Sequence, residues 1–326
     1  MINPEAKLSK KLLTKEVDMV PTRNGYGEGL VEAGEKDKRI VALCADLTES
    51  TRTQAFAEEF PKRFIEVGVA EQLLITVAAG MANYGKIPFI TSYAAFSPGR
   101  NWEQIRTTAA LNDVPVKIGG MHAGISVGPD GATHQALEDM ATMRSIPNMI
   151  VIAPTDSIES KKATIAATKH KGPVYMRFGR EKVPVVTTKK TPFKIGKAEV
   201  FRDGKDVAVI ACGSLVYEAL MAAEQLKGQV DVMVVNNHTI KPIDVETITA
   251  AAKKTGAVVT AEEHQINGGM GSAVMEVLGE HMPVPVKRVG IKDLFGQSGE
   301  PDELMDLYGL KSKDIIAAIK EVVKRK

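Results

Sequence analysis

The chain has 326 residues, of which 44% are hydrophobic and 25% are charged, and its formal net charge is +2. These proportions are typical of a globular protein, and so small a net charge gives no electrostatic footprint for nucleic acid, which excludes a nucleic-acid-binding protein. No apolar run is long enough to cross a bilayer and the N-terminus carries no signal-peptide pattern, so we expect a cytoplasmic protein without a membrane partner.

The length exceeds the usual size of a single core, so two domains are expected. Residues 1–19 carry little periodic apolar content and are expected to form an N-terminal arm. In the first domain, expected over residues 20–181, helical patterns alternate with apolar strand-like runs at 39–45, 64–68, 87–93, 114–118, 149–154 and 173–178. Such strands, separated by single helices, imply an α/β fold with a mostly parallel sheet and helices on both faces.

A linker is expected over residues 182–194, where prolines and paired lysines interrupt any helical period. Residues 195–326 then indicate a second, smaller α/β domain with about four or five strands. The two cysteines, Cys44 and Cys212, each lie near the end of an apolar run, one in each expected domain. They are expected to be buried free thiols, not a disulfide or a metal site.

The loop expected over residues 118–135, IGGMHAGISVGPDGATHQ, is the stretch most typical of a functional site. Its glycines, at positions 119, 120, 124, 128 and 131, allow the backbone to approach a ligand closely or to turn sharply. It connects an expected strand to an expected helix, which is where open α/β sheets bind ligands. His122, Asp130 and His134 supply its polar chemistry. A glycine-rich connection with solvent-facing polar residues explains the same pattern, and both interpretations stay open.

Other candidates lie near the ends of expected strands and helices. Glu71 begins an apolar helix, where a carboxylate acts in catalysis, caps the helix or compensates its dipole. Tyr93 and Phe96 follow a strand and form an aromatic wall for a planar ligand or part of the core. Arg177 and Arg180 lie at or just past a strand end, where an arginine binds phosphate or forms a surface ion pair.

Arg23, Asp46 and Ser50 carry no local signal of a function by themselves. The turn NGGMGS, at residues 267–272, opens an expected helix and is similar to an anion-binding turn, because backbone N–H groups at a helix start bind anions. A lone glycine cluster is weak evidence for a ligand, so we interpret this turn as structural.

Taken together, five segments resemble the thiamine-diphosphate enzymes of the transketolase family. They are ADLTES, EVGVAEQ, YAAF, HAGISVGPDGATHQ and the arginine pair, in the order and near the spacing seen in that family. Residues 20–185 resemble the family's pyrimidine-binding domain and, less sharply, residues 195–326 resemble its C-terminal domain. The resemblance implies a parallel-sheet pyrimidine-binding domain followed by a smaller α/β transketolase C-terminal domain.

The resemblance also implies roles for individual residues. Glu71 matches the glutamate that hydrogen-bonds the aminopyrimidine ring of thiamine diphosphate and helps to activate it, and Glu71 and His134 are the expected catalytic residues. Tyr93 and Phe96 match the pocket for the pyrimidine, and which of them stacks on the ring stays open. Asp130 and His134 match family positions that bind the sugar hydroxyls of the substrate. The matches to positions that bind its phosphate are Arg23, Ser50, His122 and Arg180. Asp46 matches a position beside the cofactor pocket without an assigned role.

One part of the family's cofactor site is not recognisable in this chain. These enzymes hold the diphosphate through Mg²⁺ on an N-terminal domain that carries GDG and a downstream asparagine, and no GDG occurs here. The resemblance therefore implies the C-terminal subunit of a split transketolase, inactive alone, with Mg²⁺ held mainly by an N-terminal partner subunit. A heterotetramer is expected, in which a homodimer of this chain, formed through both domains, binds two partners.

The implied activity is transfer of a two-carbon ketol unit from a ketose phosphate to an aldose phosphate. Deoxyxylulose-phosphate synthase shares GATHQ and a YxxF segment, but its segment at the position of MHAG usually differs, so His122 favours transketolase. The β subunit of 2-oxoacid dehydrogenases is also a separate chain of this size, but its loop typically reads HS where this chain has THQ. A non-catalytic scaffold subunit is a further alternative, against which intact Glu71 and His134 argue.

Overall fold

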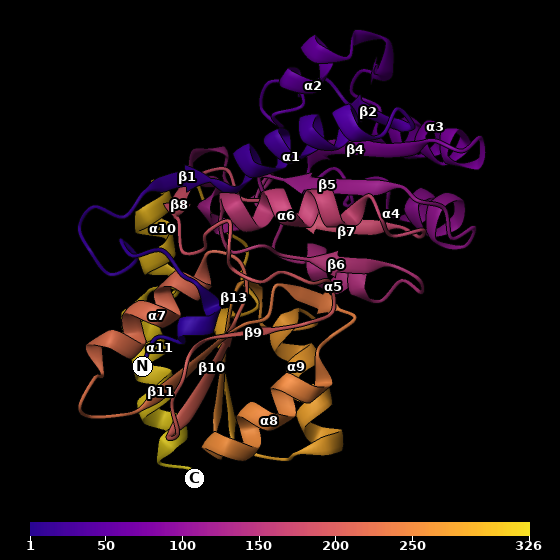
Figure 1. Ribbon diagram of the computed structural model, residues 1–326. Coiled ribbons are helices and arrows are strands. Elements are labelled where there is room, and N and C mark those ends of the chain that lie inside the picture. The colour runs from indigo at the N-terminus through magenta and orange to yellow at the C-terminus, as the bar shows by residue number, and fades with distance from the viewer.

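The computed structural model describes residues 1–326 and contains two mostly parallel sheets. The indigo to magenta part of the chain builds the upper sheet in Figure 1 and the orange to yellow part builds the lower one, beside which both chain ends lie. The expected α/β class with mostly parallel sheets is confirmed. None of the helices has the length and apolar character needed to cross a bilayer. Cys44 and Cys212 are buried free thiols, as expected.

The larger sheet has seven strands, in the spatial order β12 (Thr239–Lys241), β6 (Ile150–Ile152), β7 (Val174–Arg177), β5 (Lys117–Met121), β4 (Ile87–Tyr93), β2 (Ile40–Cys44) and β3 (Phe64–Glu66). Only β12 runs antiparallel to its neighbour. The helices of this part are α1 (Thr22–Lys36), α2 (Gln54–Glu59), α3 (Glu71–Asn83), α4 (Trp102–Gln104), α5 (Asp139–Arg144) and α6 (Ser157–Ala167), with a π-helix, η3 (Ile105–Ala110).

Neighbouring residues of a strand point to opposite faces of its sheet, which explains how the larger sheet is covered. Ile40 of β2 packs in one apolar cluster with side chains of α1 and α6, whereas Val41 packs in another with side chains of α3 and η3. Every residue of β2 and β5 is buried, because helices cover both faces.

The smaller sheet has five strands, in the order β14 (Val286–Ile291), β13 (Val258–Gln265), β10 (Val207–Ala211), β11 (Val232–Asn236) and β9 (Glu199–Arg202), and only β9 is antiparallel. Its helices are α7 (Leu215–Gln225), α8 (Val245–Thr255), α9 (Met270–His281), α10 (Pro301–Leu307) and α11 (Ser312–Val323). Val209 packs with α7 and α11, and Ile210 packs with α8 and α9. The cluster that contains Ile210 also contains side chains of α3 and η3, so one apolar core joins the two sheets.

The expected arm and linker pack against the rest of the protein. Residues 1–19 include a 3-10 helix, η1 (Pro4–Ala6), and the side chains of Ala6 and Leu12 are buried with Phe201 of the smaller sheet. Strand β1 (Met19–Pro21) pairs antiparallel with β8 (Lys182–Pro184), which lies inside the expected linker. These segments are held in place because their apolar side chains enter the core of the smaller sheet.

Candidate active site

The candidate residues gather where strands of the larger sheet end, which is the usual place for a ligand in an open α/β sheet. Tyr93 is the last residue of β4, and His122 directly follows β5. Arg180 lies three residues past the end of β7. Ser50 lies between β2 and α2, and Arg23 is the second residue of α1. The fold therefore brings together residues that are up to 157 positions apart in the chain.

Two aromatic rings and two imidazoles form a cluster at this edge. The rings of Tyr93 and His122 are stacked, with centroids 4.1 Å apart and an interplanar angle of 26°. Phe96 lies almost parallel to Tyr93 at 6.2 Å, and its ring meets the edge of His134 at 5.3 Å. The four rings therefore pack against one another at the sheet edge, and their use as a wall for a planar ligand stays a prediction.

Burial and a neighbouring arginine together set the protonation state of His122. Arg23 Nη1 lies 2.8 Å from His122 Nε2 and donates to the carbonyl oxygen of Ser50 at 2.7 Å. A guanidinium has only donors, so Nε2 is the acceptor and the proton of the neutral ring is on Nδ1. Burial, together with the charges of Arg23 and Arg180, lowers the pKa of His122 to about 3. His122 is therefore a neutral hydrogen-bond donor at physiological pH.

The same corner carries spare donors and concentrated positive charge. His122 Nδ1 and Arg23 Nε are buried and have no hydrogen-bond partner in the protein. Burial and the neighbouring Arg52 and Arg180 lower the pKa of Arg23. Buried donors without partners and clustered guanidinium groups are what an anionic group such as phosphate would satisfy.

Arg180 is held against the loop that carries Asp130. Its Nη1 donates to the carbonyl oxygen of Val127 at 3.0 Å and to Asp130 Oδ1 at 3.4 Å, and its Nε lies 3.6 Å from a carboxylate oxygen of Glu181. Asp130 and Arg180 are both about one-third exposed, so their side chains remain accessible to a ligand. Thr133 Oγ1 lies 2.8 Å from His134 Nδ1 and helps to orient that ring.

Glu71 is a buried carboxylate that does not cap its own helix. It is the first residue of α3, its side chain is 1% exposed, and no side chain caps the N-terminus of α3. Its oxygens accept hydrogen bonds from Ser92 Oγ and Arg100 Nη1, both at 3.2 Å. Asn101 Nδ2 donates to its backbone carbonyl oxygen at 2.9 Å. Glu71 therefore does not cap α3 through its side chain, whereas its place in the first turn remains compatible with dipole compensation.

Ser92, Arg100 and Asn101 are site residues that the sequence analysis missed. Ser92 precedes Tyr93 on β4, and Arg100 and Asn101 follow the YAAF segment. Arg100 also lies over the ring of Phe96, with its guanidinium carbon 5.5 Å from the ring centroid. The only sequence signal was their closeness to that aromatic segment.

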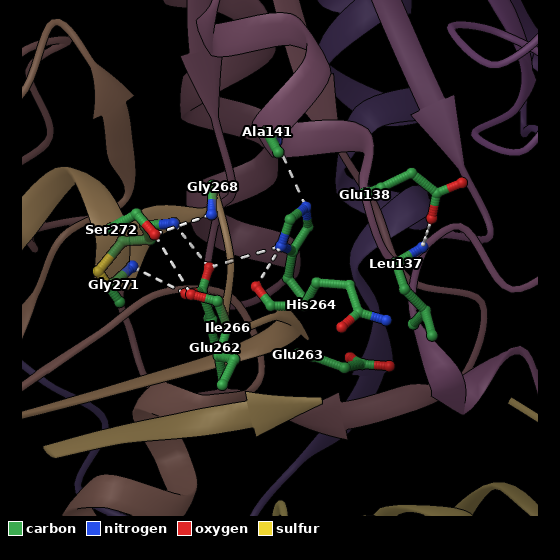
Figure 2. A network of polar contacts seen from close by, with 12 residues as sticks. Leu137, Glu138, Ala141, Glu262, Glu263, His264, Ile266, Gly268, Gly271 and Ser272 are labelled. Carbon is green, nitrogen blue, oxygen red and sulfur yellow. Dashed lines mark hydrogen bonds and ion pairs between the residues drawn. The ribbon is translucent and has the colours of Figure 1, made fainter. Parts of the chain in front are cut away.

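Three other candidates lie outside this cluster or are committed elsewhere. The backbone N–H of Asp46 donates to the carboxylate of Glu66 at 2.7 Å. Arg177 is buried, its Nε pairs with Asp139 at 2.9 Å, and its Nη2 donates to backbone oxygens, so these donors are used within the protein. At the turn 267–272, the N–H groups of Met270 and Gly271 donate to the buried Glu262 carboxylate at 2.6 and 2.8 Å (Figure 2). The protein's own carboxylate thus fills that possible anion site.

The glycine-rich stretch differs from the loop expected from Ile118 onward. Residues 118–121 belong to β5, and residues 125–130 form a 3-10 helix, η4 (Ile125–Asp130). Gly120 is needed in the strand because a Cβ would lie 2.2 Å from the Tyr175 hydroxyl oxygen. Gly124 has a φ of +97°, and a Cβ there would lie 2.2 Å from Glu263 Oε1. These two glycines thus permit close packing within the protein.

No group of three or more His, Cys, Asp or Glu side chains is arranged to hold a metal ion. The site consists of a buried carboxylate, an aromatic and imidazole cluster, and a cationic corner. This arrangement fits an aromatic heterocycle beside Glu71 and a polar, anionic molecule beside the arginines.

Comparison with known proteins gives matches along nearly the whole chain. Residues 18–186 match the family model of the transketolase pyrimidine binding domain, and residues 196–315 match that of the transketolase C-terminal domain. A putative transketolase C-terminal section from Methanocaldococcus jannaschii is 47% identical over 93% of this chain and 96% of its own length. A 6-deoxy-6-sulfo-D-fructose transketolase subunit from Clostridium sp. is 44% identical over 93% of this chain and 95% of its own length.

A solved structure described as a split gene transketolase, inactive beta4 tetramer, superposes with a TM-score of 0.88 at 44% identity. The match covers 94% of this chain and 99% of that one. These relatives therefore share the boundaries of this chain as well as its fold.

Proposed function

This chain belongs to the transketolase family, and from that premise we propose that it is the C-terminal subunit of a split, thiamine-diphosphate-dependent transketolase. The proposed reaction moves a two-carbon ketol unit from a ketose phosphate to an aldose phosphate. The single observation that carries the proposal is the meeting of buried Glu71, the Tyr93 and Phe96 rings and the Arg23 and His122 pair at one sheet edge.

The residues around Glu71 fit the pyrimidine half of thiamine diphosphate. When bound, this cofactor supplies an acidic thiazolium carbon and the electron sink that ketol transfer requires. Glu71 would hold a proton at the ring nitrogen of the aminopyrimidine, and Tyr93 and Phe96 would pack on the ring face. Ser92 and Arg100 orient the carboxylate from the side of β4 and its following turn.

The cationic corner fits the anionic end of the substrate. Arg23 and His122 present buried donors without partners, and Arg180 and Ser50 complete the proposed grip. The name of the Clostridium relative includes a sulfo sugar, and a sulfonate presents terminal oxygens much as a phosphate does. A corner of arginine and imidazole donors suits either group.

The loop residues would act along the sugar chain. Asp130 accepts hydrogen bonds from substrate hydroxyls, and His134 binds a hydroxyl and moves a proton at that oxygen. This role of His134 fits its position between the Phe96 ring and Thr133, because a ring nitrogen bonded to Thr133 fixes which nitrogen faces the substrate.

We propose that an N-terminal partner subunit completes the site by holding Mg²⁺ and the diphosphate. The chain lacks a GDG segment, and the relatives with the same boundaries are named as a C-terminal section and a subunit. The similar solved structure is described as an inactive tetramer of beta chains. The expected active form is a heterotetramer, in which a homodimer of this chain binds two partners.

Reconstitution tests this function. The purified chain is mixed with its N-terminal partner, thiamine diphosphate and Mg²⁺, and transfer from xylulose 5-phosphate to ribose 5-phosphate is assayed. We expect activity only with all four components, and a 6-sulfo ketose is assayed in parallel as donor. Conversion of pyruvate and glyceraldehyde 3-phosphate instead would identify a deoxyxylulose-phosphate synthase, and no turnover with any donor would favour a scaffold subunit.

A further inference from the structure

The loop with the proposed substrate residues packs closely against the smaller domain. Three of its glycines have positive φ values and pack against that part of the protein. A Cβ added at Gly124 would lie 2.2 Å from Glu263 Oε1. A Cβ at Gly128 would lie 2.9 Å from Pro301, and one at Gly131 would lie 2.6 Å from Ser298. Close packing and positive φ values therefore explain these three glycines, which the sequence left open between ligand approach and a sharp turn. The loop is therefore shaped by residues from the other end of the chain.

Glu263 makes the most specific of these contacts. Glu263 is 6% exposed and lies on β13, at the edge facing the loop. Its Oε1 accepts the backbone N–H of Ser126 at 2.8 Å, and its Oε2 accepts the hydroxyl of Ser214 at 3.2 Å. Ser126 lies four residues after His122 and four before Asp130, so this hydrogen bond fixes the middle of the segment that joins these two proposed substrate residues.

The two adjacent carboxylates of β13 have different tasks. Figure 2 shows Glu262 and Glu263 pointing away from one another, as neighbouring residues of a strand do. Glu262 accepts N–H groups at the start of α9, within the smaller domain. Glu263 instead bonds a residue of the other domain. The pair therefore offers a built-in comparison between a carboxylate that stabilises a helix and one that contacts the loop.

Further contacts hold the far end of the loop. Gln135 Nε2 donates to the carbonyl oxygens of Ile125, Gly128 and Gln297, at 3.0 to 3.3 Å. Arg177 Nη2 donates to the backbone oxygens of Ala136 and Glu263 at 3.3 and 2.8 Å. The loop is thus held by residues of both domains, with Gln297 and Glu263 contributed by the smaller one and Arg177 by β7 of the larger sheet.

We propose that Glu263 is a positioning residue, which acts through the Ser126 N–H to place His122 and Asp130 for substrate binding. This inference rests on the proposed function and gives the smaller domain a part in that function, because it shapes the substrate site without contacting the substrate. The effect should therefore fall on the KM of the sugar substrates more than on the binding of thiamine diphosphate.

The test compares Glu263→Ala and Glu263→Gln with Glu262→Gln as the matched control. In the isolated chain, amide hydrogen exchange at Ser126 should become faster by about tenfold or more in Glu263→Ala, because a hydrogen bond to a charged acceptor is lost. It should be intermediate in Glu263→Gln, whose amide oxygen can still accept, and unchanged in Glu262→Gln. In the reconstituted enzyme, the KM for the ketose should rise about tenfold in Glu263→Ala, with less change in kcat.

The two readouts separate this inference from the proposed function. If the wild-type mixture transfers no ketol unit, the function fails while the exchange data still decide the positioning. Wild-type exchange at Ser126 in Glu263→Ala would overturn the inference, as would an equal rise in KM in Glu262→Gln. If Glu263→Ala does not fold, Glu263→Gln carries the same comparison at nearly unchanged volume.

Discussion

Replacing Glu71 by glutamine separates the proposed catalytic role of this residue from its structural one. The amide preserves the size of the side chain and can still accept the Ser92 hydroxyl, whereas the charge that faces Arg100 is lost. Arg100 is 53% exposed, so solvent screens the ion pair and its loss should change the free energy of unfolding by only about 0–1 kcal/mol. Stability should therefore be nearly unchanged.

Turnover should fall much further. A positioned group that holds a proton contributes about 10²- to 10⁴-fold to rate, which corresponds to about 3–5 kcal/mol of transition-state stabilisation. The assay is kcat of the reconstituted enzyme, with urea unfolding of the isolated subunit measured in parallel. The reasoning is refuted if kcat of Glu71→Gln stays within about tenfold of wild type, or if its loss is matched by a comparable loss of stability.

Glu159→Gln is the matched control for this experiment. Glu159 is also 1% exposed and also lies in the first turn of a helix, but its carboxylate bonds Thr155 N–H and Asn236, away from the site. Burial raises its pKa to about 8, so below that pH it is mostly protonated and already resembles glutamine. Its replacement should leave kcat unchanged at neutral pH.

Four further outcomes are expected. The imidazole ¹⁵N spectrum of His122 should remain that of a neutral ring from about pH 8 down to about pH 5, because its pKa is lowered to about 3; a midpoint near 6.5 would contradict the burial argument. Arg23→Ala should raise the pKa of His122 and increase the KM for a phosphorylated ketose by about 10- to 100-fold, with an unchanged KM speaking against the phosphate grip. The free energy of unfolding should decrease between about pH 5 and pH 8 as the unfolded chain releases the Glu159 proton that the folded protein retains, and urea titrations should show a weaker decrease in Glu159→Gln. Gly124→Ala should cost about 1–3 kcal/mol in the same titrations because of its φ of +97° and its contact with Glu263, so wild-type stability would exclude that contact.

The sequence predicted the parts of this structure that depend on local pattern. Apolar runs such as 39–45 and 87–93 became buried parallel strands, because helices cover both faces of the sheet. Short antiparallel additions, including β1, β9 and β12, were not anticipated. Each has only three or four residues, which is too short for an alternating pattern to be recognised. Each forms because it pairs with a strand that is distant in the sequence.

For the site, the residue types were recognisable but their partners were not. The cluster around Tyr93 and His122 follows from strand ends that a parallel sheet places side by side. The hydrogen bonds that hold Glu71 come from β4 and from the segment after it, where Ser92 and Arg100 look like ordinary polar residues. The sequence left the loop glycines open between ligand approach and a sharp turn, because the residues against which they pack, such as Glu263 at Gly124, lie more than 130 positions away.

Strand β12 bears on how this protein can be divided into fragments. Thr239–Lys241 lie in the chain between β11 and β13 of the smaller sheet, yet they pair with β6 at the edge of the larger one. A fragment ending near residue 195 would uncover that edge, and an uncovered edge is a template for pairing between molecules. It would also lose Lys241, whose ammonium group donates to the carbonyl oxygens of Arg144 and Ile146. The first half expressed alone should therefore aggregate unless residues 239–241 are supplied with it.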